Sequence, residues 1–278
     1  MTGIMIGIII AFILLYLFMV CPRVFHKPDR TPLYGVHYAH RGLFDNDSDA
    51  PENSLKAFQK AADAGYGIEL DVQLSKDDIP VVFHDASLKR VCGIDGNVWD
   101  YTLEELQQMK LAHSKQTIPT FEEALRVIDG KVPLIIEYKM DRPDTKVCVL
   151  GDQVLKHYKG VYCMESFHPF AVRWYRKNRP EIVRGQLSAD FRRDGMKGPD
   201  KKLVTWLLSN FLCRPDFIAY RHEDAGNFSR RLCRRFGALS VAWTIKSQEQ
   251  YEKAKDQFDL FIFDSFLLKS AAKKNPSE

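Results

Sequence analysis

Polar side chains that could perform acid–base or metal chemistry lie at the ends of several short apolar runs. Two histidines, His40 and His84, each close such a run, and three carboxylates lie within two others, at Glu69, Asp71 and Glu137. In an extended strand, residues two apart point to the same face, so Glu69 and Asp71 share one face. Burying such charges is costly unless they are paired or bind a cation. Their recurrence at the ends of runs therefore predicts a functional site.

The residue types narrow the chemistry of this site. Three carboxylates from two strands form a hard oxygen cage, which suits Mg²⁺ or Ca²⁺ better than zinc. Two histidines can act as a general acid and a general base. Arg41 and Lys139, which stand beside these groups, can neutralise an anionic substrate. We therefore expect one divalent cation as cofactor and cleavage of a phosphate ester, with the histidines moving protons.

The elements that must position these residues are short apolar runs alternating with helical patterns. The runs are rich in Val, Ile, Phe and Tyr, as strands are. Repeated alternation of this kind predicts a parallel α/β barrel or a doubly wound sheet. The runs lie at residues 36–39, 68–72, 81–83, 134–138, 161–164, 183–187, 217–220, 239–245 and 260–263.

Two features depart from a regular barrel. Nine runs are one too many for eight strands, and residues 74–80 are too short to hold the crossover helix that parallel neighbours need. We therefore expect residues 81–84 to pair differently from a barrel strand. Residues from about 86 to 115 are predicted to form a small insertion, in which Thr102 and Glu105 have the spacing of a capping box.

The N-terminus has a different composition from the rest of the chain, because the first charged residue is Arg23. About 20 apolar residues in a helix span about 30 Å, the thickness of a bilayer core. A secretory signal peptide would carry a basic residue before its apolar core and a small-x-small cleavage site after it, and neither is present. The pattern predicts a transmembrane anchor at 1–22 followed by a stiff linker at 23–34.

The charges after the apolar segment predict its orientation. Arg23, Lys27 and Arg30 follow it, opposed by Asp29 alone. Because basic residues favour the cytoplasmic side, we expect a single-pass membrane protein with its main domain in the cytoplasm.

Composition excludes several other classes of protein. With 278 residues, 45% hydrophobic and 27% charged, the chain is neither disordered nor collagen-like. A net charge of +4 is too small to indicate a nucleic-acid partner. Six cysteines are spread singly, without a CxxC or CxxH pair, so we expect neither a zinc site nor a disulfide scaffold. The sequence leaves the oligomeric state open.

Five motifs, taken in order, resemble those of the glycerophosphodiester phosphodiesterase family. Together with the apolar N-terminus, they resemble a membrane-anchored bacterial-type member. The resemblance extends over about residues 35–268, and Ser166-Phe167 and Trp243-Thr244 resemble later, weaker motifs. It implies a TIM-type (β/α)8 barrel at 35–270 with a small insertion, leaving a tail at 271–278. The five motifs are His40-Arg41-Gly42, Pro51-Glu52-Asn53-Ser54, Glu69-Leu70-Asp71-Val72, Val81-Val82-Phe83-His84-Asp85 and Ile136-Glu137-Tyr138-Lys139.

This resemblance implies metal-dependent hydrolysis of a glycerophosphodiester to glycerol 3-phosphate and an alcohol, through a cyclic phosphate intermediate. It assigns acid–base roles to His40 and His84. The remaining assignments are metal ligands at Glu69, Asp71 and Glu137, and phosphate contacts at Arg41 and Lys139.

Several positions keep two interpretations. Glu52 and Asn53 either support the metal site or begin a helix, and Trp243 is either a wall of the substrate site or part of the core. The family often has Asn where this chain has Lys246, and Asp-x-Pro where it has Asp264-Ser265-Phe266. These departures leave open which alcohol is released from the glycerophosphodiester.

Alternative functions remain at this stage. One is lysophospholipase D action on lysophospholipids, and another is a non-catalytic membrane-tethered sensor with the same fold. Two segments could also contact lipid. They are residues 201–208, otherwise a helix packed on the barrel, and the stripe of Arg230, Arg231, Arg234 and Arg235, otherwise a solvated helix face.

Overall fold

The structure, a computed structural model, describes residues 2–140, 144–196 and 198–268. The predicted tail at 271–278 and the last two residues of the predicted barrel lie outside the described residues.

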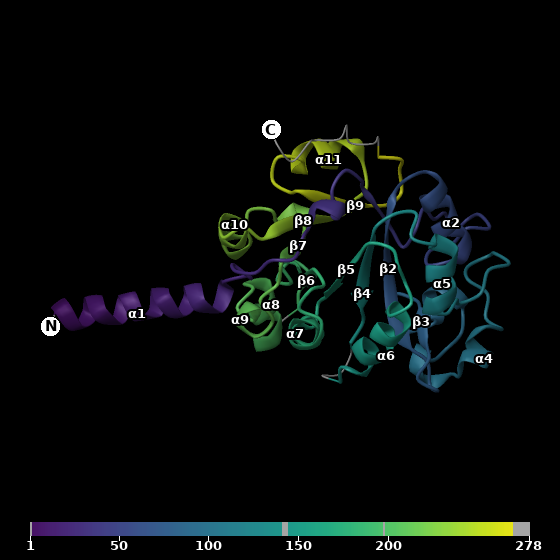
Figure 1. The fold of residues 1–278 in the computed structure, drawn as a ribbon, viewed down its shortest axis with the longest axis horizontal. Coiled ribbons are helices and arrows are strands. Elements are labelled where there is room, and N and C mark those ends of the chain that lie inside the picture. Colours follow the sequence, from purple (N-terminus) through teal and green to yellow (C-terminus); the bar gives the residue numbers. More distant parts are fainter. Residues whose placement is uncertain (1, 141–143, 197, 269–278) are drawn as a thin grey trace.

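Eight parallel strands form a closed barrel (Figure 1). The first strand, β1, pairs with both β2 and β9, so the barrel has no open edge. This closure confirms the TIM-type barrel and excludes the doubly wound sheet, which would leave two open edges. The barrel strands are β1 (Tyr38–His40), β2 (Gly67–Leu74), β4 (Leu134–Tyr138), β5 (Tyr162–Ser166), β6 (Arg184–Ser188), β7 (Phe217–Arg221), β8 (Leu239–Ile245) and β9 (Leu260–Phe263).

The third run, at residues 81–83, pairs differently from the barrel strands, as predicted. Strand β3 (Pro80–Val82) lies antiparallel to β2, with Val72 opposite Val82. The turn between them contains Asp78 in a left-handed conformation, with φ of 64°. A turn this short can only reverse the chain, so β3 forms a hairpin with β2 and is not a member of the barrel.

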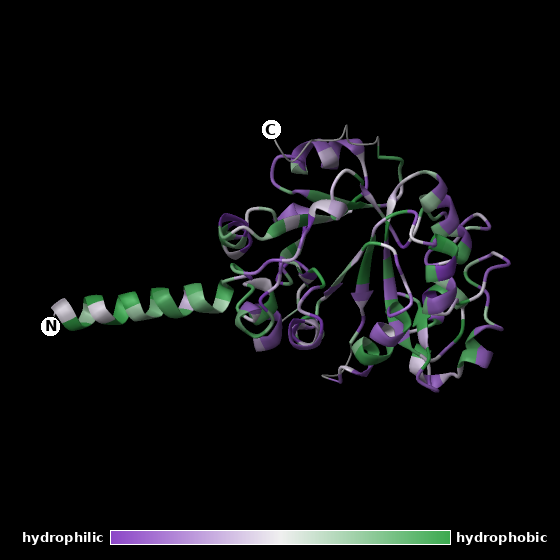
Figure 2. Ribbon diagram, in the orientation of Figure 1, coloured by the Kyte–Doolittle hydropathy of each residue, from purple (hydrophilic) through white to green (hydrophobic). Residues whose placement is uncertain are grey.

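Helices cover the outside of the barrel and bury their apolar faces on it (Figure 2). Ser54 is the N-cap of the first of them, since its hydroxyl accepts the backbone N–H of Ala57. The cap of this helix is therefore Ser54 and not Asn53. The covering helices are α2 (Leu55–Asp63), α5 (Phe121–Ile128), α6 (Lys146–Leu155), α7 (Pro169–Asn178), α8 (Pro199–Thr205), α9 (Asn210–Cys213), α10 (Phe228–Arg235) and α11 (Gln248–Ala254).

The inside of the barrel has an apolar floor. Tyr38, Ile135, Cys163, Phe217 and Leu239 are buried there together, near the amino ends of their strands. Two residues further along three of these strands, the inward positions carry His40, Glu137 and Glu165 instead. The barrel is thus packed with apolar side chains at one end and polar at the other, the end where the active sites of such barrels lie.

Residues 83–120, between β3 and α5, form an excursion from the barrel that has a small core of its own. It contains α3 (Lys89–Cys92), the 3₁₀ helix η2 (Val98–Asp100) and α4 (Leu103–Leu106), packed around side chains such as Leu88 and Leu106. Thr102 and Glu105 form the predicted capping box at the start of α4. The excursion is therefore a packed unit attached to one side of the barrel.

Helix α1 (Thr2–Val20) projects away from the barrel as a separate rod (Figure 1). Its large apolar side chains are exposed over most of its length. The segment expected to be a linker, residues 23–34, is packed against the barrel. The Arg23 backbone N–H donates to the Pro215 carbonyl. Leu33, at the end of the 3₁₀ helix η1 (Thr31–Leu33), is buried in the barrel floor.

The arginine stripe predicted on α10 is not one solvated face. Arg230 is 2% exposed and donates to the Ala225 carbonyl and the Ser240 hydroxyl. Arg234 pairs with Asp259, with an N–O distance of 3.1 Å. Arg231 and Arg235 are the exposed members of the stripe. Half of the predicted stripe therefore serves packing, because α10 turns Arg230 and Arg234 toward the neighbouring strand connections.

Candidate active site

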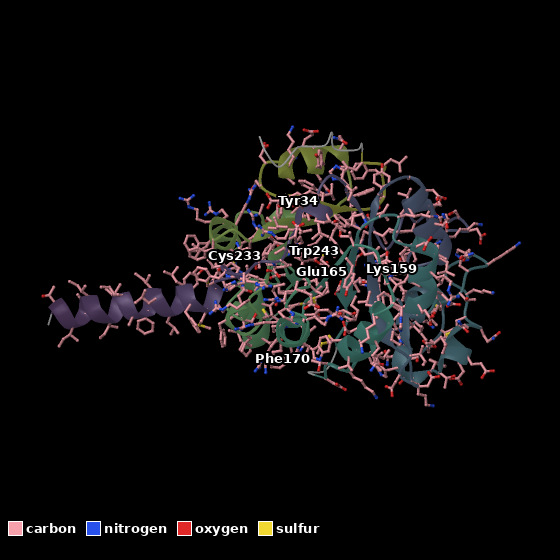
Figure 3. The ribbon with its side chains drawn as sticks, in the orientation of Figure 1. Tyr34, Lys159, Glu165, Phe170, Cys233 and Trp243 are labelled. Carbon is pink, nitrogen blue, oxygen red and sulfur yellow. The ribbon has the colours of Figure 1, made fainter. Side chains whose placement is uncertain are left out.

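The carboxylates lie in register across three neighbouring strands. Asp71 of β2 pairs with Glu137 of β4, which pairs in turn with Glu165 of β5, while Glu69 lies opposite His40 of β1. Residues in register on parallel strands project to the same side, so four acidic side chains enter one end of the barrel. In Figure 3, Glu165 lies within the ring of strands.

Three of these acids form a group that could hold a metal ion. Glu69, Asp71 and Glu137 are buried, and each offers one carboxylate oxygen within 4.8 Å of the others. Burial raises the pKa of Glu69, and the neighbouring charges of Asp71 and Glu137 raise it further. Buried carboxylates that repel one another fit a divalent cation of the hard, oxygen-preferring kind, because such an ion would satisfy all three.

Two basic side chains already balance part of this negative charge. The Lys139 ammonium forms ion pairs with Asp71 and Glu137, with N–O distances of 2.9 Å and 2.7 Å. The Arg41 backbone N–H donates to Glu69, and its guanidinium lies 3.6 Å from Asp71. Burial alone would raise the pKa of Asp71, but these two cations and the nearby His84 and His40 hold it well below its usual range. Asp71 is therefore ionised at the centre of the site.

His40, at the end of β1, is held by a carboxylate far away in the sequence. Its Nδ1 lies 2.8 Å from Asp264 Oδ2, just beyond β9, and its Nε2 lies 3.9 Å from Glu69. Burial lowers the pKa of His40 to about 4, although Asp264 opposes this shift. Burial would raise the pKa of Asp264, yet hydrogen bonds from His40 and Ser265 hold it below its usual range. The pair is thus a neutral imidazole donating from Nδ1 to a carboxylate, which leaves Nε2 as a proton acceptor.

His84, like His40, is held by a carboxylate bonded to its Nδ1. Its Nδ1 lies 2.6 Å from Asp85 Oδ1, and Asp85 accepts a second bond from the Arg90 guanidinium at 2.6 Å. Arg90 comes from α3 of the excursion, and it also forms two bonds of 2.7 Å to Glu52. The packed excursion therefore brings a cation that fixes the carboxylate behind His84.

Glu52 and Asn53 support the site from behind. Glu52 is ion-paired with Arg41 and Arg90 and accepts a bond from Asn46. Asn53 adopts a left-handed conformation, with φ of 57°, and its amide donates to Asp71 at 2.8 Å. Both side chains thus contact residues of the site, and Glu52 lies outside the group of three carboxylates that could hold a metal ion.

Trp243, at the end of β8, faces the same interior. Its ring packs edge-on against Phe167 with centroids 5.6 Å apart, and its indole N–H is buried without a hydrogen-bond partner among the described residues. Figure 3 shows Trp243 near Glu165 in projection, over the middle of the barrel. The half-buried ring thus packs on the apolar interior of the barrel, and a buried N–H without a partner there is costly.

Sequence reasoning missed three residues of this arrangement. Glu165 carries the same signal as Glu137, an acid at the end of an apolar run. It is 1% exposed, one of its oxygens has no hydrogen-bond partner among the described residues, and burial beside Glu137 raises its pKa. In the sequence, Asp264 stands out only as part of a departing motif, and Arg90 has no local signal.

Comparison with known proteins agrees with this geometry. The family model described as the glycerophosphoryl diester phosphodiesterase family matches residues 40–261. The chain belongs to this family. A glycerophosphodiester phosphodiesterase of Bacillus altitudinis is 33% identical over 55% of this chain and 66% of its own length. The Bacillus subtilis homologue YhdW is 42% identical over 77% of this chain and 88% of its own length.

Solved structures of the family have the same fold. An Oleispira antarctica phosphodiesterase, in complex with the product sn-glycerol-3-phosphate, matches with a TM-score of 0.67 and 26% identity, over 83% of this chain and 93% of the other. The Thermotoga maritima glycerophosphodiester phosphodiesterase matches with a TM-score of 0.63 and 26% identity, over 83% of this chain and 95% of the other.

Replacing Asp264 with Asn tests how this family member positions His40. We expect kcat to fall at least ~10-fold, because an amide no longer selects the imidazole tautomer that leaves Nε2 as acceptor. Loss of the negative charge also lowers the pKa of His40, so the acidic limb of the kcat/KM profile should move to lower pH. Steady-state kinetics across pH measures both. D256N, which makes the same change at an exposed aspartate, is the matched control and should leave kcat and the pH profile unaltered. An unaltered profile in D264N would disprove the role of Asp264 in positioning His40.

Proposed function

We propose that this enzyme hydrolyses glycerophosphodiesters, such as glycerophosphocholine or glycerophosphoethanolamine, to glycerol 3-phosphate and an alcohol in a metal-dependent reaction. The observation that carries the proposal is the pairing of each histidine with its own carboxylate, beside a buried group of three acids. Two imidazoles fixed through Nδ1 present two Nε2 atoms for proton transfer at one anionic substrate.

The metal site is formed by Glu69, Asp71 and Glu137, with Glu165 adjoining. When bound there, Mg²⁺ or Ca²⁺ would withdraw charge from the phosphate oxygens and favour attack at phosphorus. Lys139 and Arg41 lie against the same acids and would also hold the phosphate. Burial around them keeps water from weakening these contacts.

The two histidines divide the proton transfers. His40 is neutral through burial, so it can take the proton of the glycerol 2-hydroxyl as this oxygen attacks phosphorus. His84 would protonate the departing alcohol oxygen, and a cyclic phosphate would remain. The roles then reverse: His84 takes a proton from water as the water oxygen bonds to phosphorus. The bond between phosphorus and the glycerol 2-oxygen breaks, and His40 returns a proton to that oxygen. Trp243 would form a wall of the substrate site.

Lysophospholipase D action is the second candidate, favoured by the apolar α1 next to the barrel. A non-catalytic sensor has no comparable support, because the acid, base and carboxylate side chains are all present and arranged together.

Metal dependence and substrate class can be measured together. We expect a chelator to abolish phosphodiesterase activity and Mg²⁺ or Ca²⁺ to restore it, because three buried carboxylates need a cation to accept an anionic substrate. Rates on glycerophosphocholine and its acylated form, lysophosphatidylcholine, separate the two candidates: the deacylated compound should react faster. Activity that survives complete metal removal would refute the carboxylate-cage assignment, and faster turnover of the acylated compound would favour lysophospholipase D.

Alanine variants test the histidines. His40→Ala and His84→Ala should each lose at least ~100-fold in kcat, the usual scale for a general acid or base. His113→Ala, an exposed histidine in the excursion, should react normally. Metal affinity, measured by calorimetry, should remain in both site variants. Near-normal turnover by either site variant would contradict its assigned role.

We also propose that α1 is a retained, single-pass membrane anchor with the barrel in the cytoplasm. The helix is apolar enough to cross a bilayer, with a mean hydropathy of 2.9, and a signal sequence is the competing interpretation. Contacts of its last turns with the barrel favour retention, since the Asn210 amide donates to the Val20 carbonyl at 2.8 Å within the buried interior. Cleavage of α1 would leave such buried groups without partners.

Reporter fusions at the C-terminus test this location. A cytoplasm-active fluorescent protein should be bright and membrane-bound, and an alkaline phosphatase fusion inactive, because the basic residues after α1 favour the cytoplasmic side. Intact-mass measurement of the membrane-extracted chain should include α1. An active phosphatase fusion would reverse the orientation, and a chain lacking α1 would establish a signal peptide.

A further inference from the structure

The inner end of α1 is fixed to the barrel wall at several points. The Tyr16 hydroxyl lies 2.8 Å from the Ser229 hydroxyl on α10. The Arg214 guanidinium, just after α9, donates to the Phe18 carbonyl at 2.9 Å and to the Cys21 carbonyl at 2.7 Å. Cys233 of α10 lies beside this end of the helix, where its thiol contacts the Val20 carbonyl (Figure 3). The helix therefore has a defined position on the wall formed by α9 and α10.

No charged segment separates the exposed apolar part of α1 from this wall. Large apolar side chains are exposed from Ile4 to Leu15 and again at Phe18, whereas Tyr16 already bonds to α10. The first charged residue, Arg23, follows these contacts. Given the proposed membrane anchor, the wall around α9 and α10 then borders the headgroup layer.

Two basic hollows lie on this wall, one beside α9 and one beside α10. The first has a volume of about 310 Å³ and is lined by Arg173, Arg176 and Lys177 of α7 with Phe211 and Leu212 of α9. Phe211 also packs against Phe18 of α1, with ring centroids 6.0 Å apart. No carboxylate is among these lining residues. The first hollow thus combines three cations with an apolar side that borders the membrane helix.

The second hollow, of about 420 Å³, is lined by Arg230, Arg231, Arg234 and Arg235 of α10 with Gln257. Arg230 and Arg234 are engaged by protein groups, and Arg231 and Arg235 are exposed. The same helix carries Phe228, which is 54% exposed and stacks on Tyr16 with ring centroids 6.3 Å apart. An exposed aromatic ring next to cations is the composition of a surface at the boundary between acyl chains and headgroups.

We propose that these two hollows bind anionic phospholipid headgroups and thereby hold the barrel against the membrane by its α9–α10 wall. If α1 spans a bilayer, the lipid phosphate groups lie at the level of the α9–α10 wall. The two hollows present cations to these phosphate groups. The enzyme is then not a domain on a flexible tether. It has one wall facing lipid and a fixed orientation of its active site relative to the bilayer surface.

Native mass spectrometry of the full chain in detergent tests this binding directly. With equal amounts of phosphatidylglycerol and phosphatidylcholine, we expect two molecules of phosphatidylglycerol to be retained, at least threefold more than phosphatidylcholine. R173E/K177E and R231E/R235E should each lose one of the two molecules, and the fourfold variant should lose both. K60E/K131E, with the same change of charge at exposed lysines on α2 and after α5, should keep both.

Melting temperature and phosphodiesterase activity report whether each variant is folded. Should a charge reversal unfold the chain, R173Q/K177Q and R231Q/R235Q replace it, and 0.5 M salt should weaken retention by the wild type. Equal retention of both lipids by the wild type, or a preference for phosphatidylglycerol that survives all four changes, would overturn the proposal. Loss of lipid preference with normal activity would leave the proposed catalytic function intact.

Discussion

Repulsion among buried acids is the constraint on which the rest of the site depends. Four carboxylates from three neighbouring strands enter one end of the barrel, where water cannot screen them. Such an arrangement is costly unless cations are present, and Lys139 and Arg41 supply part of the compensation. The negative charge that they leave uncompensated suits a divalent ion, which we propose as the cofactor of phosphate ester cleavage.

The histidines are positioned by the same electrostatic means. Each imidazole bonds through Nδ1 to a carboxylate that is itself held ionised, His40 by Asp264 and His84 by Asp85. The carboxylates fix the tautomer, so the outer ring nitrogens are available for proton transfer. The excursion after β3 contributes to this arrangement, since its Arg90 bonds both Asp85 and Glu52. A feature that is peripheral in the fold therefore supports the centre of the site.

The packing of the N-terminal region joins α1 to the barrel. Residues 23–34, which contain two prolines, would suit a spacer between α1 and the barrel, yet the Arg23 N–H bonds the Pro215 carbonyl and Leu33 fills the floor of the barrel. The apolar helix and the barrel are consequently continuous through buried contacts. This continuity gives the barrel a definite orientation relative to α1.

The sequence by itself determined which acidic residues share one face of a strand, and which run could not belong to the barrel. Period-two spacing placed Glu69 with Asp71, and the short turn before residue 80 ruled out a parallel β3, because both depend on local geometry alone. Only the tertiary structure decided that Asp264 bonds His40, 224 residues away, that Glu165 aligns with Glu137, and that Arg230 is buried. These contacts depend on strand register, on closure of the barrel and on the rotation of a helix against its neighbours, and no local pattern specifies any of the three.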